Sequence, residues 1–167
     1  NEKIYDVLIN KESIVNNQLY DERAKNIFLL LRQMLISDVL TYRGLSPISA
    51  KLVDKVIRES EFYEHFDILV YALGKRLNRS TYDRQEILKL EEDIRSSQLS
   101  SLLLNKMINV HLKYLNTDSV VSRARALKNL PEELRFLSEK AMSSSSMLIK
   151  MYLCYIQMQY FLLMKQV

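Results

Sequence analysis

The sequence predicts an all-α protein, an irregular helical bundle of about seven helices around one long central helix. Its 167 residues include only two Gly and two Pro, where ordinary usage would give about twenty. Strands and Gly-rich loops need these residues at their turns, so their scarcity favours helices with short connections. The stretch 83–115 contains neither residue, and as a single helix it would be on the order of 45–50 Å long.

The composition is that of a folded domain. Hydrophobic residues make up 48% of the chain, which excludes intrinsic disorder. We therefore predict a single all-helical domain over 1–167, with 1–20 as a loosely attached N-terminal segment. The one cysteine, Cys154, cannot form an internal disulfide, and residues 1–20 mix charges with apolar residues. Both observations favour an intracellular protein, cytoplasmic or nucleoid-associated.

The first strong helix is predicted over 21–42. Asp21 and Glu22 lie in its first turn, where carboxylates interact favourably with the helix dipole. Apolar residues then recur at helical spacing, interrupted only by Asp38. Additional apolar positions widen this stripe, so we expect the helix to be buried on more than one side. The stripe and its flanks are Ile27, Phe28, Leu30, Leu31, Met34, Leu35, Ile36, Val39 and Leu40.

A break follows at Gly44, Ser46 and Pro47, which suit a left-handed helix end, a cap and a first helical turn. Two helices are predicted next, over 47–58 and 61–78. Their inner faces are expected to hold Ile48, Leu52, Val53, Val56 and Ile57 in the first, and Phe62, Phe66, Leu69, Val70 and Leu73 in the second. Ser80 and Asp83 resemble a capping box at the entrance to the central helix.

The central helix 83–115 has two unlike halves. Its first half carries a narrow apolar strip, whereas residues 102–115 are apolar over a wide arc. The serines at 96, 97, 100 and 101 lie between them, and solvent exposure is favoured there over a close helix crossing. A short basic helix is predicted over 120–128, and Pro131 is expected to begin another that ends near Met142.

Residues 147–164 are the most apolar segment and allow three interpretations. A membrane span needs about twenty apolar residues, but Lys150, Gln157 and Gln159 interrupt this segment, so we expect no membrane span. A strand would have no visible partner. We favour a helix buried on nearly all sides, either within the core or, second, by a partner protein. The candidate partner interface is Tyr152, Tyr155, Met158 and Phe161.

The net charge of +4 is concentrated in the last third, where 120–167 hold seven Lys or Arg and three Glu. Two basic clusters are candidates for nucleic-acid binding, because phosphate contacts come from such groups on one face. They are Lys75, Arg76, Arg79 and Arg84, and Arg123, Arg125 and Lys128. Acidic residues lie beside both clusters, so a solvated face of mixed charge is the favoured interpretation.

No constellation of reactive residues is evident. His65 and His111 are isolated, without a second His or Cys at a ligand-like spacing, so we expect no metal. Glu91, Glu92 and Asp93 are consecutive, and consecutive residues on a helix point in different directions. No Gly-rich loop or nucleophile motif is present. We predict that the protein is not an enzyme and needs no cofactor.

Part of the chain has an order of features found in a known family. Glu61–Glu64 precede an apolar helix, a long helix ends in Leu112–Leu115, and Leu130–Leu134 follow a connection. This order resembles the α-helical domain of archaeal GINS subunits. The chain differs at Met107–His111, where that family has paired arginines, and it shows no small β domain. The resemblance implies a non-catalytic scaffold that joins replicative helicase to primase or polymerase.

The leading functional hypothesis is a non-enzymatic helical protein–protein interaction subunit or adaptor of a larger assembly, for which the resemblance implies the DNA replication machinery. Its partners would be other protein subunits bound through apolar helix faces, and an oligomer is compatible with this. The first alternative is a nucleic-acid-binding accessory factor that uses the basic clusters. The second is a helical effector or host-interaction protein of a pathogen.

Overall fold

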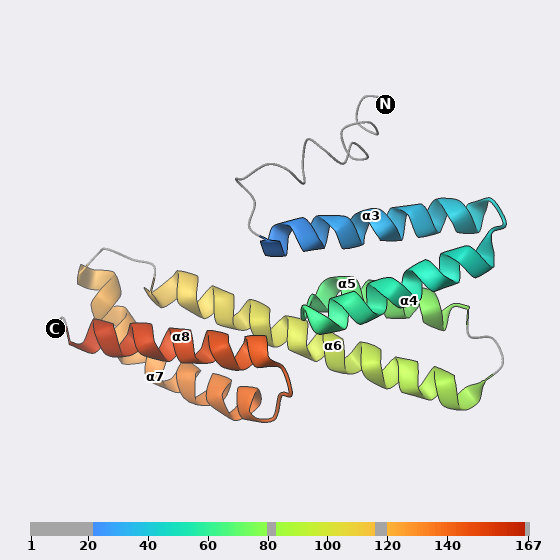
Figure 1. The fold of residues 1–167 in the computed structure, drawn as a ribbon. Helices are drawn as coiled ribbons and strands as arrows, with labels where there is room; N and C mark the ends of the chain where they lie inside the picture. The colour runs from blue at the N-terminus through green and yellow to red at the C-terminus, as the bar shows by residue number, and fades with distance from the viewer. Residues whose placement is uncertain (1–21, 80–82, 116–119, 166–167) are drawn as a thin grey trace. The chain divides into compact units, whose positions relative to one another are not determined.

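The computed structural model describes residues 22–79, 83–115 and 120–165. Within them the chain forms six α-helices and one π-helical segment, with no strand, which confirms the all-α prediction. The elements are α3 (Glu22–Tyr42), α4 (Ser46–Phe62), α5 (Phe66–Leu77), α6 (Arg84–Val110), η1 (His111–Leu115), α7 (Val120–Met142) and α8 (Met147–Met164) (Figure 1).

The chain divides into two compact units between Ser97 and Gln98, inside α6. Unit 1 contains α3, α4, α5 and the first part of α6. Unit 2 contains the rest of α6 with η1, α7 and α8. Each unit has its own set of buried apolar side chains.

Unit 1 is built around an antiparallel pair, α3 and α4, joined at Gly44, whose φ of +77° is the predicted left-handed turn (Figure 1). Its core residues are Leu30, Met34, Val53, Val56, Ile57, Ile68, Leu69, Ala72, Leu73 and Leu90. The expectation that the first helix is buried on more than one side is wrong. Leu31, Leu35, Ile36 and Val39 are all exposed, because only one strip of α3 meets α4 and α5.

The break between α4 and α5 lies later than predicted. α4 continues to Phe62, and the turn is made by Glu64, which has a φ of +53°. The His65 amide then donates to the Ser60 carbonyl oxygen at 2.9 Å. No Gly or Pro marks this turn in the sequence, and a left-handed glutamate is not expected from propensity. Phe62, predicted to face inward, is 80% exposed, and Ile48 is exposed too.

Asp83 forms the cap of α6. Its Oδ1 accepts hydrogen bonds from the amides of Gln85 at 2.9 Å and Glu86 at 3.3 Å, which satisfies donors that have no partner inside the helix. Ser80, the other half of the predicted capping box, lies outside the described residues. The prediction that the serines at 96, 97, 100 and 101 are exposed to solvent is wrong at Ser97. Ser97 is buried, and its hydroxyl donates to the Asp93 carbonyl oxygen at 2.8 Å.

The central helix predicted over 83–115 changes character before its end. It is α-helical from Arg84 to Val110, and His111–Leu115 form the π-helical segment η1. A π-turn inserts one residue into the helix, and here it follows buried Val110 and contains buried Tyr114. The change of pitch has no marker in the sequence.

The prediction of two helices around Pro131 is wrong, because α7 runs unbroken from Val120 to Met142. A proline inside a helix removes one backbone hydrogen bond. Leu130, Leu134, Leu137 and Ala141 are nevertheless all buried at helical spacing, and their burial favours continuing the helix through Pro131. The unit 2 core consists of Met107, Val110, Tyr114, Leu130, Leu134, Leu137, Ala141, Ile149, Leu153 and Ile156.

Candidate functional site

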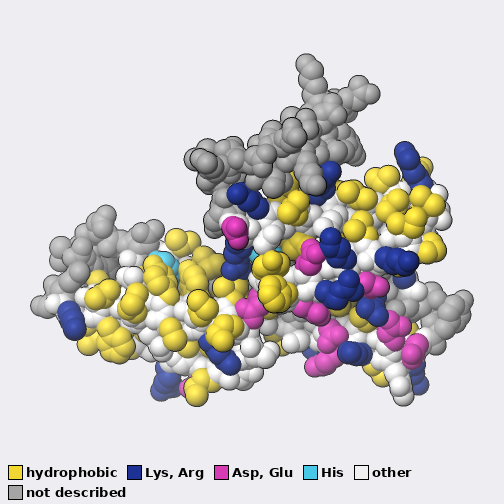
Figure 2. All heavy atoms as spheres, viewed as in Figure 1, with side chains coloured by type: hydrophobic (Ala, Val, Ile, Leu, Met, Phe, Trp, Pro, Cys, Tyr) yellow, Lys and Arg dark blue, Asp and Glu magenta, His cyan; other side chains and the backbone are white. Residues whose placement is uncertain are grey.

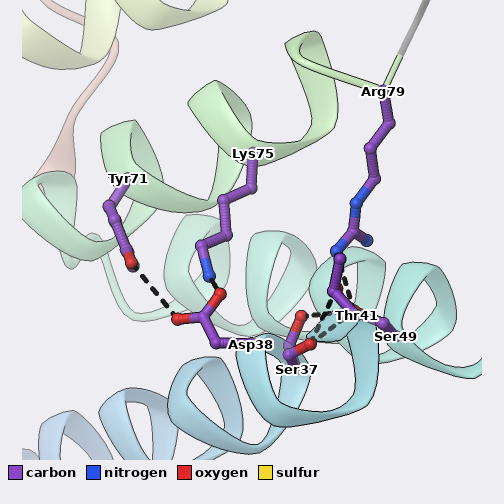
Figure 3. A network of polar contacts seen from close by, with 7 residues as sticks. All are labelled: Ser37, Asp38, Thr41, Ser49, Tyr71, Lys75 and Arg79. Atoms are coloured by element: carbon purple, nitrogen blue, oxygen red, sulfur yellow. Dashed lines mark hydrogen bonds and ion pairs between the residues drawn. The ribbon is translucent and has the colours of Figure 1, made fainter. Parts of the chain in front are cut away.

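The first basic cluster is engaged in contacts within unit 1. Lys75 on α5 forms an ion pair with Asp38 on α3, and the Tyr71 hydroxyl donates to the same carboxylate at 3.5 Å (Figure 3). Burial lowers the pKa of Lys75, and the nearby Arg79 lowers it further. The positive charge of Lys75 is therefore compensated by a carboxylate on the neighbouring helix.

Arg76 bridges two other helices. Its guanidinium lies 3.3 Å from Asp54 on α4 and 3.1 Å from Glu86 on α6. All three side chains are partly exposed, so each pair contributes little stability on its own. The two carboxylates nevertheless offset the charge that would attract a phosphate.

Arg79 completes a polar network in unit 1. Its Nη2 donates to Thr41 and Ser49, each at 2.7 Å, and the Ser49 hydroxyl lies 2.7 Å from that of Ser37 (Figure 3). Ser37 and Ser49 are fully buried, and Ser49 also donates to the Ser37 carbonyl oxygen at 2.8 Å. Buried hydroxyls need such partners. The network joins the end of α5 to α3 and α4, and we name it the Arg79 network.

The remaining basic residues lie elsewhere. Arg84 is exposed at the first residue of α6, and Lys128 is exposed on α7. The side chains of Arg123 and Arg125 lie outside the described residues. The structure thus brings Lys75, Arg76 and Arg79 together on one helix end but directs them toward protein groups. Nucleic-acid binding by either cluster stays a prediction.

Ser146 caps the start of helix α8, and its side chain accepts a hydrogen bond from the Ile149 amide at 3.1 Å. One strip of the helix is buried in unit 2, namely Ile149, Leu153 and Ile156. On its flank, Gln157 Nε2 donates to the Ser138 hydroxyl on α7 at 3.3 Å. α8 is therefore fixed in place by α7 and η1 through this one side.

The expectation that α8 is buried on nearly all sides is wrong within this chain. Opposite the buried strip runs a second apolar stripe, which we name the α8 seam: Met147, Met151, Cys154, Met158 and Phe161. The seam residues are exposed, Met151 at 63% and Phe161 at 62%. Tyr155 and Leu162 extend the seam on one side, and with it they form what we call the outer face of α8. Figure 2 shows hydrophobic side chains gathered on the surface of unit 2.

A shallow, open hollow of about 350 Å³ lies along this face. Its walls come from α8 and the residue that follows it: Cys154, Gln157, Met158, Phe161, Leu162 and Lys165. The hollow is a groove between side chains on the surface of one helix, which is the shape that a side chain from a second helix fills.

Tyr152, the fourth predicted interface residue, points inward. Its hydroxyl lies 3.1 Å from His111 Nδ1 on η1, and the ring of His111 also packs against Tyr155, 5.1 Å between centroids. Burial raises the pKa of Tyr152, with a smaller contribution from Tyr155. The π-helical segment thus positions His111 to orient the two tyrosines, and only Tyr155 reaches the outer face.

His65 is the other histidine and lies in unit 1. It is buried, its ring stacks on Tyr63 at 5.9 Å between centroids, and its Nε2 has no hydrogen-bond partner among the described residues. Burial lowers the pKa of His65, and Arg23 adds to the effect. The described part of the chain holds no group of three or more His, Cys, Asp or Glu that could bind a metal.

Within the described residues, α8 is also the one helix long and apolar enough to cross a membrane, judged by length and composition alone. Its 18 residues have a mean hydropathy of 1.2, and 17% of them are buried. The same composition suits a helix covered by another protein, because Met and aromatic residues are enriched at interfaces.

Comparison with known proteins adds no further assignment, since no family model, curated protein or solved structure matches the chain. The resemblance to GINS subunits stays a prediction. Of the predicted interface residues, Tyr155, Met158 and Phe161 lie on the outer face. Sequence reasoning missed Met147, Met151, Cys154 and Leu162. Alternating steps of four and three residues along the α8 seam were the signal for most of them.

Proposed function

We propose that this protein is a non-enzymatic helical interaction subunit that docks a partner helix on the outer face of α8. The observation that carries the proposal is the α8 seam itself. Five exposed residues recur at steps of four, three, four and three, which is the pattern that one helix presents to another in knobs-into-holes packing.

The extent of this surface supports docking. Six large apolar side chains of the outer face are between 39% and 64% exposed, and at about 200 Å² for each fully exposed side chain they present on the order of 600 Å². That equals or exceeds the largest apolar patch of a typical monomer. A patch of this size fits a protein that functions when covered.

The Arg79 network and the ion pairs of α5 favour a protein-binding function over nucleic-acid binding. Lys75 and Arg76 each have carboxylate partners, and Arg79 donates to hydroxyls. A phosphate would have to displace these contacts before it could bind. The resemblance to GINS subunits makes a replication assembly the first setting in which to look for the partner.

Site-specific photocrosslinking in the source cells tests the proposal. A photoreactive residue replacing Met158 should give a discrete crosslinked product, and Met151→Glu in the same chain should abolish it by placing a charge in the seam. A photoreactive residue replacing Lys89, which is exposed on the polar side of α6, is the matched control. Absence of product at 158, or equal product at 158 and 89, would contradict the proposal.

A further inference from the structure

We infer that the helix docked on the outer face of α8 is the α8 of a second copy of this chain, in antiparallel orientation. This inference rests on the proposed function, because it names the partner of the same surface. It starts from the order of residues along the α8 seam.

The α8 seam is nearly symmetric about Cys154. Met151 and Met158 lie three and four residues from it, and Met147 and Phe161 lie seven residues away on either side. A two-fold axis at Cys154 would therefore place Met147 against Phe161 of the second copy. A surface that matches itself after a half-turn is what an isologous dimer requires.

Side-chain size along the seam fits the same arrangement. The small Cys154 stands at the centre and is exposed, so two helices can approach closely there. The larger Met147, Met151, Met158 and Phe161 lie on both sides and are 51% to 64% exposed. They would fill the space on either side of the closest approach.

Charge favours the antiparallel over the parallel pair. Lys150 is exposed beside the seam, and the described residues of α8 include no Asp or Glu to pair with it. In a parallel pair the two Lys150 side chains would lie at the same level. With the axis at Cys154, four residues away, they are separated by about 12 Å along an antiparallel pair.

The area is sufficient for a specific dimer. Each copy presents on the order of 600 Å² on the outer face, so a pair that covers both faces completely buries about 1,200 Å² of large apolar side chains, which is the lower limit of standard interfaces. Cys154 and the stem of Lys150 add to this area. The dimer should therefore be reversible at micromolar concentration rather than permanent.

Sedimentation equilibrium of the full chain tests the inference. We expect the mass to rise from 19.7 kDa toward twice that value with concentration. Met151→Lys combined with Met158→Lys should weaken self-association about 100-fold or more, because it places two charges in the centre of the interface. The control is Leu35→Lys combined with Val39→Lys, on the similarly exposed stripe of α3, which should leave the association unchanged.

Disulfide trapping tests the orientation. Mild oxidation should crosslink two chains through Cys154, and Cys154→Ser should abolish the product. In the Cys154→Ser background, a mixture of Met147→Cys and Phe161→Cys chains should crosslink with each other. Crosslinking of Met147→Cys chains with one another, and of Phe161→Cys chains with one another, would contradict the antiparallel orientation. Circular dichroism of every variant controls for folding.

The remaining outcomes separate this inference from the proposed function. If the protein is a monomer and residue 158 photocrosslinks to a different protein, the partner is not a second copy. The proposed docking function would then still hold. If the protein is a monomer that co-floats with phosphatidylcholine–phosphatidylglycerol vesicles, and this requires the unsubstituted α8 seam, the seam binds a membrane. That result would contradict both the second copy and the docking of a partner protein. A dimer unaffected by the paired lysine substitutions would place the interface elsewhere and overturn this inference.

Discussion

Helices α3 and α8 look alike in sequence and are used differently. Both are rich in apolar residues, both were expected to be buried broadly, and both bury only one strip. On α3, polar residues belong to the side that faces the neighbouring helices: Ser37, Asp38 and Thr41 bond to Ser49 on α4, Lys75 on α5 and Arg79. On α8, the α8 seam continues without a charged residue from Met147 to Phe161.

The two helices are held in place by different kinds of contact. Hydrogen bonds and ion pairs are directional, so the Arg79 network fixes the register of α3 against its neighbours. Apolar contacts are less directional. The buried strip of α8 is therefore supplemented by hydrogen bonds at its edge, which Ser146, Tyr152 and Gln157 form. The outer face of α8 instead presents the exposed apolar side chains of the α8 seam.

Substitutions on the two sides of α8 should change the free energy of unfolding by very different amounts. Ile156→Ala should lower the free energy of unfolding by about 2–5 kcal/mol, because Ile156 is fully buried and its truncation leaves a cavity. Met158→Ala, two residues away and 51% exposed, should change it by less than about 0.5 kcal/mol in dilute solution. Urea denaturation monitored by circular dichroism measures both. Equal effects would contradict the assignment of inner and outer faces.

A smaller effect is expected for the polar anchor of α3. Arg79→Met should lower the free energy of unfolding by about 1–2 kcal/mol, since it removes charge-assisted hydrogen bonds to Thr41 and Ser49. Arg84→Met, at an exposed position, is the matched control and should have almost no effect. If the two variants are equally stable, the Arg79 network does not fix α3.

The smallest effect concerns pH and the buried His65. Its lowered pKa means that the unfolded chain takes up a proton near pH 6.5 before the folded chain does. The free energy of unfolding should therefore fall as pH drops below 6.5, by no more than about 1.4 kcal/mol per pH unit for one proton. His65→Gln should make this slope shallower between pH 7 and 5.5 in urea titrations. If His65→Gln leaves this pH dependence unchanged, protonation of His65 does not cause it.

The sequence predicted the helical class, and the bounds of α3 and α8 almost to the residue, because Gly44, Pro47 and the serines before Met147 are local signals that need no tertiary information. It mispredicted the break near Glu64 and the continuity of α7 through Pro131. In both cases packing overrides local propensity. At Pro131, buried residues at helical spacing keep the helix intact in spite of the proline, whereas at Glu64 the chain turns although no Gly or Pro is present.

The candidate site was predicted only in part, for a physical reason. Apolar periodicity tells which residues avoid water but not what covers them. Tyr155, Met158 and Phe161 were identified by residue type, whereas Tyr152 turned inward because η1 brings His111 within hydrogen-bond distance. The sequence alone suggested that the basic residues of α5 are free to bind phosphate, because their partners Asp38 and Asp54 are far from them in sequence.

If a second copy covers the outer face of α8, the alkylation rate of Cys154 should depend on protein concentration. Cys154 is exposed in the single chain and lies at the centre of the α8 seam. We predict rapid alkylation at nanomolar concentration and a progressively slower rate as concentration rises through the micromolar range, with the fast rate restored by Met151→Lys and Met158→Lys together. A rate that is the same at all concentrations would contradict the α8 dimer.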